Sequence, residues 1–270
     1  MGYRCSKSWN ENQKIFFATI FSQKISKHKF DEQTKKLFLE FELAEANNKK
    51  TIEARTAISS VSEEGALKNL ASEECIRFDN ALTKNTDLWE KELGKIEISG
   101  ASKKQKEIFY TSLYHCLIAP NLYSDVDNRY RGMDDQIHNT KGYNRYTVFS
   151  LWDTYRNVHQ LMTLVYPERQ MDMIHTMMGM YKEHGWFPKW ELFGQETLTM
   201  EGDPAIPVLV DSWMKGLKDF DINLAYKAMY KSATTPGKDN LMRPDNDDYM
   251  AKGYVPMESQ FDNSVSHALE

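Results

Sequence analysis

The 270-residue chain has no long apolar run and no basic run. No hydrophobic stretch approaches the roughly 20 residues that a membrane-spanning helix needs, so we expect no bilayer span. The net charge is mildly acidic, -5 at pH 7. Without clustered lysine and arginine, the chain lacks the electrostatic attraction that nucleic-acid binding requires, and we expect no nucleic-acid partner.

Cysteine is also scarce. Cys5, Cys75 and Cys116 are far apart and match no spacing typical of a zinc or redox motif. The first residues, MGYRCSKSWNENQK, contain no apolar segment of a signal peptide. The redox state of the cysteines and the cellular location therefore stay open. A chain of this length with 41% hydrophobic residues is nevertheless long enough for a full core or for two domains.

The sequence changes character near residue 62. Before this point, segment 37–43 alternates apolar and acidic residues, and segments 14–22 and 51–60 are rich in β-branched and aromatic residues. These patterns predict strands. Three or four strands are too few to bury a face by themselves, so another layer is expected to cover them.

After residue 62 the pattern becomes helical. Ser62 is a candidate N-cap, because Glu63 and Glu64 follow it, and a break is expected near Ser72. The next segments are less regular and include a long polar, tyrosine-rich stretch. The predicted elements are a broken helix over 63–93, a strand at 96–99, a helix over 102–119, and a functional loop or short hairpin over 121–147.

From residue 150 onward, apolar residues recur at helical spacing. Pro167 suits the first turn of a helix, and Gly185 and Gly216 stand where C-terminal caps occur. The methionines of MDMIHTMMGM are typical of a packed core helix rather than of a cofactor site. The predicted helices cover 150–164, 167–184, 204–216 and 221–233.

Tryptophans and charged residues stand at the junctions between these helices. Trp152 precedes Asp153, and Trp190 precedes Glu191. Sugar rings have apolar faces and hydroxyl edges, so their sites combine flat aromatic side chains with carboxylate and guanidinium groups. Asp153 and Arg156 would share one helix face. A Trp–Asp pair at a helix start is also typical of a capped and packed helix end, so both interpretations stay open.

The segment 186–203 favours the sugar-site hypothesis. It contains two tryptophans and four acidic residues, and glycines and prolines interrupt it. Loops rich in aromatic and acidic residues between long helices are where functional residues concentrate. The segment therefore indicates a binding site for carbohydrate.

Seven segments in order resemble glycoside hydrolase family 92, the calcium-dependent exo-acting α-mannosidases. The segments are FATIFSQ, AISSVSEEGALKNLASE, IFYTSLYHCLIAPNLYSDVDNRYRG, YTVFSLWDTYRNVHQLMTL, GWFPKWELFGQET, GYVP and SVSHALE. The resemblance implies an α+β multidomain fold with an N-terminal β-sandwich, a helical linker and an (α/α)6 barrel. It places the C-terminal part of the sandwich in 1–62, the linker and connecting loop in 63–147, and the first helices of an incomplete barrel in 148–270.

The resemblance also implies which residues meet the substrate. Trp152 and Asp153 correspond to the tryptophan and aspartate that line the subsite for the terminal mannose. Trp190, Glu191 and Glu196 fall in the matching Trp-Glu-Leu and Glu-Thr positions, and they are expected to bind substrate as well. Where the family often has Gly-x-His-Ala, this chain has Gly-Asp-Pro-Ala at 202–205, so a proline replaces the imidazole.

The family's general acid, general base and calcium ligands belong to later motifs, and none of these motifs occurs in the 270 residues. Inversion requires an acid and a base roughly 6.5 to 9.5 Å apart. We therefore expect no catalytic residue and no calcium ligand within this chain, and no turnover by the chain alone. Ca2+ is expected only for the complete enzyme.

Three hypotheses follow. The chain is part of an inverting exo-α-mannosidase whose partners are α-mannoside glycans and the missing remainder of the same enzyme. Alternatively, it is a non-catalytic remnant that binds mannosides, or an (α/α)6 hydrolase or phosphorylase that acts on another glycoside. A phosphorylase would need a basic phosphate-binding cluster, which the loops do not show. The resemblance implies a periplasmic, cell-surface or secreted location, and linkage specificity stays open.

Overall fold

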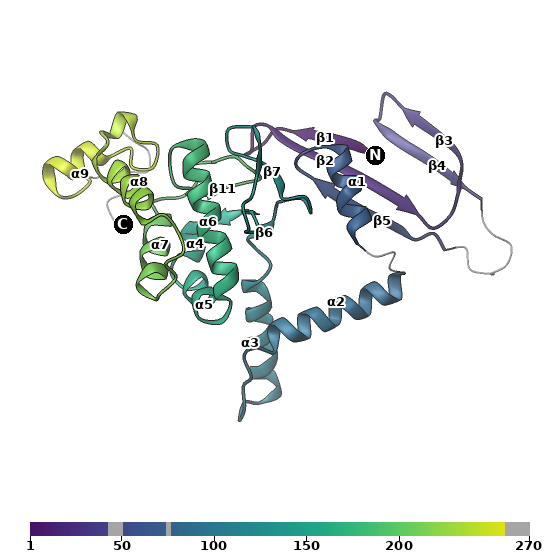
Figure 1. The fold of residues 1–270 in the computed structure, drawn as a ribbon, viewed down its shortest axis with the longest axis horizontal. Coiled ribbons are helices and arrows are strands. Elements are labelled where there is room, and N and C mark those ends of the chain that lie inside the picture. The colour runs from purple at the N-terminus through teal and green to yellow at the C-terminus, as the bar shows by residue number, and fades with distance from the viewer. Residues whose placement is uncertain (43–50, 74–76, 257–270) are drawn as a thin grey trace.

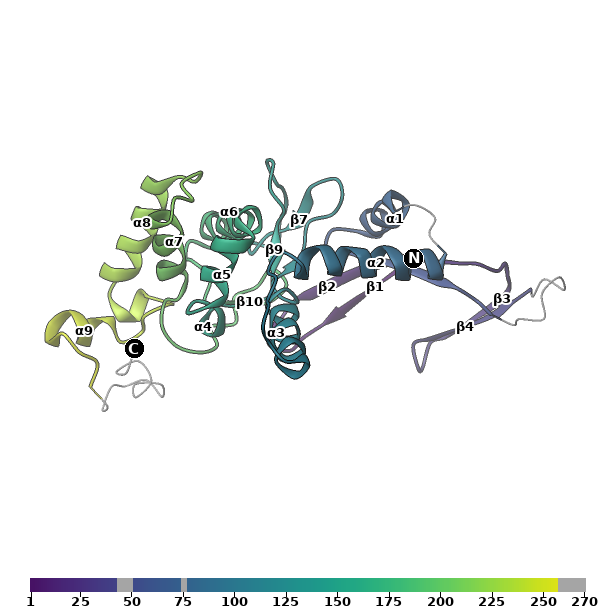
Figure 2. The same cartoon turned by 90° about the horizontal axis from the view of Figure 1, so that it is seen from below.

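The computed structural model describes residues 1–42, 51–73 and 77–256. Figures 1 and 2 show an elongated molecule with the long strands at one end and a group of helices at the other. The architecture is a mixed α and β fold with small sheets. The SVSHALE motif and Glu270 lie outside the described residues.

A three-stranded antiparallel sheet in the order β1-β2-β5 forms the core of the N-terminal end. A separate β3-β4 hairpin extends beyond it. These strands confirm the predicted strand character before residue 62. Their bounds are β1 (Gly2–Ser6), β2 (Gln13–Phe21), β3 (Ile25–Asp31), β4 (Lys36–Phe41) and β5 (Ala54–Ser59).

Helix α1 (Glu63–Ser72) packs on one face of this sheet. Ala18 of β2 is buried together with Ala66 and Leu70 of α1, and the small side chains of the two alanines let the helix approach the strands closely. The Ser62 hydroxyl accepts the amide of Gly65 at 3.0 Å, which confirms the predicted N-cap. The helix ends at the predicted break.

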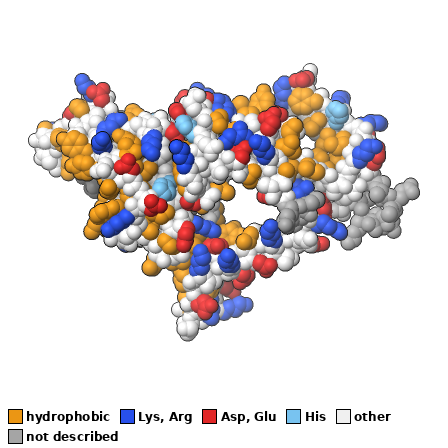
Figure 3. Space-filling view, in the orientation of Figure 1, with side chains coloured by type: hydrophobic (Ala, Val, Ile, Leu, Met, Phe, Trp, Pro, Cys, Tyr) orange, Lys and Arg blue, Asp and Glu red, His pale blue; other side chains and the backbone are white. Residues whose placement is uncertain are grey.

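Helix α2 (Phe78–Leu93) has no buried residue. Figure 3 shows an open gap between this helix and the body of the molecule. Helix α3 (Lys103–Cys116) follows, and its start is stabilised by a capping box between Ser102 and Gln105.

Residues 96–99 form no strand, so that prediction was wrong. Ile96 instead packs in a cluster with Leu113 and Tyr166, and its carbonyl accepts the Tyr110 hydroxyl at 3.1 Å. A strand needs a neighbouring backbone with which to pair, and here the side chain of Tyr110 satisfies the carbonyl group instead.

The segment 121–147 contains short strands, as its hairpin alternative predicted. Strands β7 and β8 form a hairpin, and β6 pairs with β9. The bounds are β6 (Asn121–Leu122), β7 (Arg129–Arg131), β8 (Ile137–Asn139) and β9 (Tyr146–Thr147).

The second half is helical, as predicted, and its two short strands pair with each other. Pro167 begins α6, and Gly185 caps it in the left-handed conformation, so both of these predictions are confirmed. The elements are β10 (Phe149–Ser150), α4 (Leu151–Thr154), α5 (Val158–Val165), α6 (Pro167–His184), β11 (Trp190–Glu191), α7 (Ala205–Met214), α8 (Ile222–Thr234), a 3-10 turn (Gly237–Asp239) and α9 (Asn246–Lys252).

The single helix predicted over 150–164 was wrong, because the chain breaks between α4 and α5. The carbonyl of Tyr155, free of a helical partner, accepts the side-chain amide of Gln160 at 2.7 Å. Arg156 lies within this break. Asp153 and Arg156 therefore do not share the face of a continuous helix.

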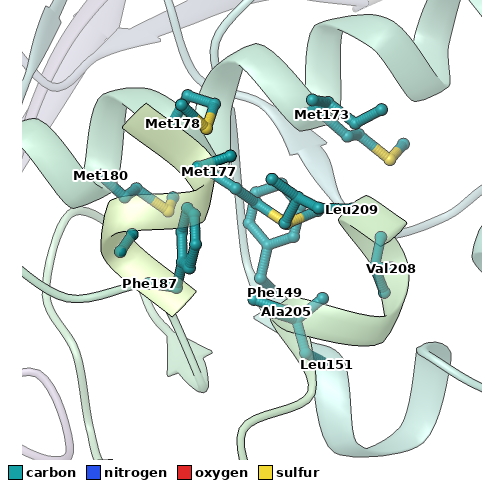
Figure 4. Packing of buried hydrophobic residues seen from close by; sticks show 13 residues of the cluster. Phe149, Leu151, Met173, Met177, Met178, Met180, Phe187, Ala205, Val208 and Leu209 are labelled. Atoms are coloured by element: carbon teal, nitrogen blue, oxygen red, sulfur yellow. The ribbon is translucent and has the colours of Figure 1, made fainter. Parts of the chain in front are cut away.

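The main core lies around α6, whose methionines pack against α7 and β10 (Figure 4). This packing confirms the prediction of a methionine-rich core helix. Among the described residues, no helix is both long enough and apolar enough to cross a membrane. The buried members shared by these elements include Phe149, Met173, Met177, Val208 and Leu209.

Candidate functional site

The β10-β11 pair brings the two aromatic–acidic dipeptides together. Ser150 pairs with Trp190, and Phe149 pairs with Glu191. Helix α4 begins directly after β10, so Trp152 and Asp153 follow the paired residue Ser150 by two and three positions. The strand pair thus joins segments that are about forty residues apart in the sequence.

A pocket of about 410 Å³ lies between α4, the start of α7 and the segment that leads into α9. Its size falls within the range of small-molecule sites, roughly 300 to 1,000 Å³. All three elements lie at the helical end of the molecule (Figures 1 and 2). Aromatic, cationic and acidic side chains line it: Trp152, Tyr155, Arg156, Asp203, Arg243 and Tyr249.

Trp152 is the predicted site residue that borders this pocket, and its side chain is 38% exposed. Arg156 borders it as well. The Arg156 guanidinium lies over the Tyr155 ring at 5.2 Å, and its Nε donates to the Tyr155 hydroxyl at 2.7 Å. Aromatic faces and guanidinium donors therefore meet at one wall of the pocket.

The other predicted residues lie nearby but do not border the pocket. Asp153 is exposed and accepts a hydrogen bond from the Ser150 hydroxyl. Trp190 is half-buried, and its carbonyl accepts the Thr197 hydroxyl at 2.8 Å. A direct sugar contact from these residues stays a prediction.

Asp203 and Arg243 form a charged pair in the pocket that the sequence analysis did not identify. The Arg243 Nε lies 3.4 Å from Asp203 Oδ2, which also accepts the Ser232 hydroxyl. The Asp203 side chain is only 3% exposed. Asp203 belongs to the acid-rich segment noted above, but nothing in the sequence links it to an arginine forty residues later.

Pro204 also borders the pocket. The imidazole that the family often has at this position could donate or accept a hydrogen bond, and proline has no such group. The charged residues that border this part of the pocket include Glu201, Asp203 and Arg243.

The carboxyl group of Glu191 is fully buried. Its oxygens accept the Thr147 hydroxyl at 2.7 Å, the Val148 amide at 2.9 Å and the Gly194 amide at 2.6 Å. Burial raises the pKa of Glu191 to about 7, although the donors of Gly194 and Thr147 and the charge of Arg145 lower it. A raised carboxyl pKa is typical of a general acid. This carboxyl group, however, faces protein groups and not the pocket.

Glu196 accepts three backbone amides, those of Lys189 at 2.8 Å, Trp190 at 2.9 Å and Leu198 at 2.9 Å. Its carboxylate thus joins the start of β11 to Leu198, which follows the turn after β11. Glu191 and Glu196 together hold the backbone on either side of Trp190.

Acidic clusters that could hold a metal ion were sought among the described side chains. Calcium takes six to eight oxygen ligands, and within residues 1–42, 51–73 and 77–256 no three His, Cys, Asp or Glu side chains are grouped closely enough to hold a metal ion.

Comparison with known families gives one match. Residues 65–270 match the model of the glycosyl hydrolase family 92 catalytic domain. No curated protein sequence matches the chain.

Solved structures of enzymes in the same family resemble the fold. The GH92 α-mannosidase BT3965 from Bacteroides thetaiotaomicron, solved alone and with mannoimidazole, has 33% sequence identity and a TM-score of 0.85 over 99% of this chain. The GH92 inverting mannosidase BT2199 from the same species has 26% identity and a TM-score of 0.79 over 91% of this chain.

The chain spans 37% to 38% of the length of the BT3965 structures and 35% of the BT2199 structure. The family match covers more than half of the chain, and the fold of BT3965 resembles 99% of it. The chain belongs to glycoside hydrolase family 92.

Proposed function

We propose that this chain supplies the pocket for the terminal mannose in an inverting exo-α-mannosidase that acts on α-mannoside glycans. The observation that carries the proposal is the pocket bordered by Trp152, Arg156 and the Asp203–Arg243 pair. Membership of the family and the likeness to mannosidases support it.

The pocket has the groups that a hexose needs. The Trp152 ring offers an apolar face for the C–H groups of the sugar, and Arg156 and Arg243 offer donors for hydroxyl oxygens. In this proposal Asp153 and Trp190 extend the site from the adjoining strand pair, and Glu191 and Glu196 shape the backbone that presents them.

We also propose the finer architecture. Residues 1–62 belong to a β-sandwich, 63–147 to a linker and connecting loop, and 148–270 to an (α/α)6 barrel. The sheet with one helix-covered face and the neighbouring helices α5, α6 and α7 support this division. In a sandwich, a second sheet would cover the face opposite α1.

We propose that this chain alone does not cleave the glycosidic bond. Inversion needs an acid and a base that both reach the substrate. The acidic residues Glu201, Asp203 and Asp245 border the pocket, and the Asp203 carboxylate is paired with Arg243. Glu191 does not border the pocket, and its carboxyl group is enclosed by protein donors. We propose that the catalytic carboxyl groups, and the calcium requirement, belong to a complete enzyme.

Substitution of Trp152 by alanine tests the binding role. We expect the variant to bind mannose about tenfold more weakly, because it loses the aromatic face. Trp213→Ala is the matched control, since Trp213 lies on α7 outside the pocket and stacks with Lys218 at 4.8 Å. Equal affinities of the two variants and the wild type would contradict the proposal. Stronger binding of glucose or galactose than of mannose would favour the alternative that the enzyme acts on another glycoside.

A further inference from the structure

Strained backbone gathers around the carboxyl group of Glu191. Val148 has a φ of +65° and Phe193 a φ of +50°, and neither is a glycine. Left-handed backbone is unfavourable for a β-branched residue and costs about 1 to 3 kcal/mol. Such conformations persist only where surrounding contacts stabilise them. The hydrogen bonds of Val148 and Phe193 therefore indicate which group stabilises this backbone.

Both strained residues are tied to Glu191. The Val148 amide donates directly to Glu191 Oε2 at 2.9 Å. The Phe193 amide donates at 2.9 Å to the Thr147 hydroxyl, which itself donates to Glu191 Oε1. Gly194 adds a third direct donor. One buried carboxyl group therefore holds the turn before β10 and the turn after β11.

Val148 is the single residue between β9 and β10, and the chain continues from it to the proposed sugar-binding residues. It directly precedes Phe149 and Ser150 of β10, and Trp152 and Asp153 follow within α4. A change of backbone direction at Val148 would move Trp152 away from the pocket wall. No direct contact between Glu191 and a ligand is needed for this effect.

We propose that Glu191 is a positioning residue, whose carboxyl group sets the direction in which β10 delivers Trp152 and Asp153 to the pocket. The assignment of these two residues to sugar binding rests on the proposed function. The part played by Glu191 in fixing Val148 and Gly194 rests on the hydrogen bonds alone.

The main test is Glu191→Gln, read out by hydrogen exchange at individual amides in the 270-residue chain. The carboxamide has only one acceptor oxygen, so it places an N–H group against Val148 or against the Thr147 and Gly194 donors. We expect exchange of the Val148 and Gly194 amides to become about tenfold faster, because a hydrogen bond to the buried carboxyl group is lost.

Asp125→Asn is the matched control. Asp125 is also a buried carboxyl group, and it accepts the Ser59 hydroxyl at 2.6 Å and the Asn69 amide group at 2.8 Å, away from the pocket. This variant is expected to loosen the region of α1 but to leave Val148 and Gly194 protected. Equal acceleration at Val148 in both variants would mean general loosening and would overturn the proposal.

A second pair of variants carries the test if Glu191→Gln fails to fold. Thr147→Val removes the hydroxyl that joins Glu191 to Phe193, and Thr147→Ser keeps it. Exchange at Phe193 should be faster in the valine variant and restored in the serine variant. Identical exchange in the two would contradict the proposal.

The fluorescence of Trp152 links this geometry to the site. The Trp152 signal is obtained by subtracting, from the fluorescence spectrum of each protein, the spectrum of the same protein with the substitution Trp152→Phe. We expect Glu191→Gln to change this signal and to weaken mannose binding, whereas Asp125→Asn changes neither. If the wild type binds no mannoside but the exchange results hold, the proposed function fails and the positioning role stands. Unchanged exchange and an unchanged Trp152 signal in Glu191→Gln would refute the positioning role itself.

Discussion

Trp190 and Glu191 are adjacent in β11, and successive side chains of a strand point to opposite sides. Glu191 accordingly points into the protein, whereas Trp190 is only half-buried. Sequence adjacency could predict that this dipeptide belongs to the site, but not which of its members faces a ligand. The same limit applies to Asp203, whose partner Arg243 comes from a distant segment.

The pKa of Glu191 gives a stability test at the scale of one residue. Burial raises this pKa from 4.5 to about 7. Because the folded state binds the proton more tightly, the stabilisation is fully present below pH 4.5 and is lost as the pH rises through 7. The difference corresponds to about 3 kcal/mol. We expect the free energy of unfolding to fall between pH 5 and 7.5, and to fall less in Glu191→Gln.

Denaturant unfolding of both proteins across this pH range measures the effect. The charged and titratable groups that act on Glu191 are Arg145, Glu196 and Tyr123, and they are the same in both proteins. Subtracting the two pH profiles therefore isolates Glu191. Parallel profiles would show that Glu191 has the same pKa in the folded and unfolded states.

At the scale of elements, local signals in the sequence located most helix ends. These signals begin or end a helix through the backbone of a single turn. The N-cap Ser62, Pro167 at a helix start and the C-cap Gly185 were each found where predicted. At the break between α4 and α5, the side chain of Gln160 donates a hydrogen bond to the Tyr155 carbonyl. The helical spacing of apolar residues continues across the break, so the pattern could not reveal it.

The loop 121–147 is attached to α6 by a buried ion pair. Arg145 donates to Glu183 at 2.7 Å, and its guanidinium lies 4.5 Å from the centre of the Tyr130 ring. Arg145→Met would leave the Glu183 charge buried without its partner. We expect this variant to lose about 3 to 5 kcal/mol of stability in denaturant unfolding.

The double variant Arg145→Met, Glu183→Gln provides the control for charge. It removes both ions, so we expect it to be more stable than the single variant. A single variant as stable as the wild type would show that the ion pair does not hold the loop to the helix. A double variant less stable than the single one would show that an uncompensated charge is not the cause of the loss.

At the scale of the whole molecule, the strand-to-helix order near residue 62 was evident from the sequence, because it depends on periodicity. The contacts that join the strand end of the molecule to its helical end were not evident from the sequence. The Asn10 side chain, in the turn between β1 and β2, donates to the carbonyls of Leu192 and Phe193 at 2.7 and 3.2 Å. These bonds link the N-terminal sheet to the turn beside Glu191, and no local pattern indicates them.

Helix α2 exposes apolar side chains on its surface, with Phe78 67% and Leu82 56% exposed. Exposed apolar surface of this kind favours association. We expect the double variant Phe78→Ser, Leu82→Lys to self-associate less in sedimentation velocity. Because these side chains are not buried, its free energy of unfolding should stay within about 0.5 kcal/mol of the wild type. Unchanged association, or a large loss of stability, would show that the surface of α2 is not free in solution.

We propose that this chain binds a terminal mannose and does not cleave the bond beside it. Calorimetric titration of the chain with an α-linked mannose disaccharide, followed by analysis of the recovered sugar, tests this most directly. We expect a saturable heat of binding and an intact disaccharide. The absence of saturable heat, or the appearance of free mannose, would contradict the account.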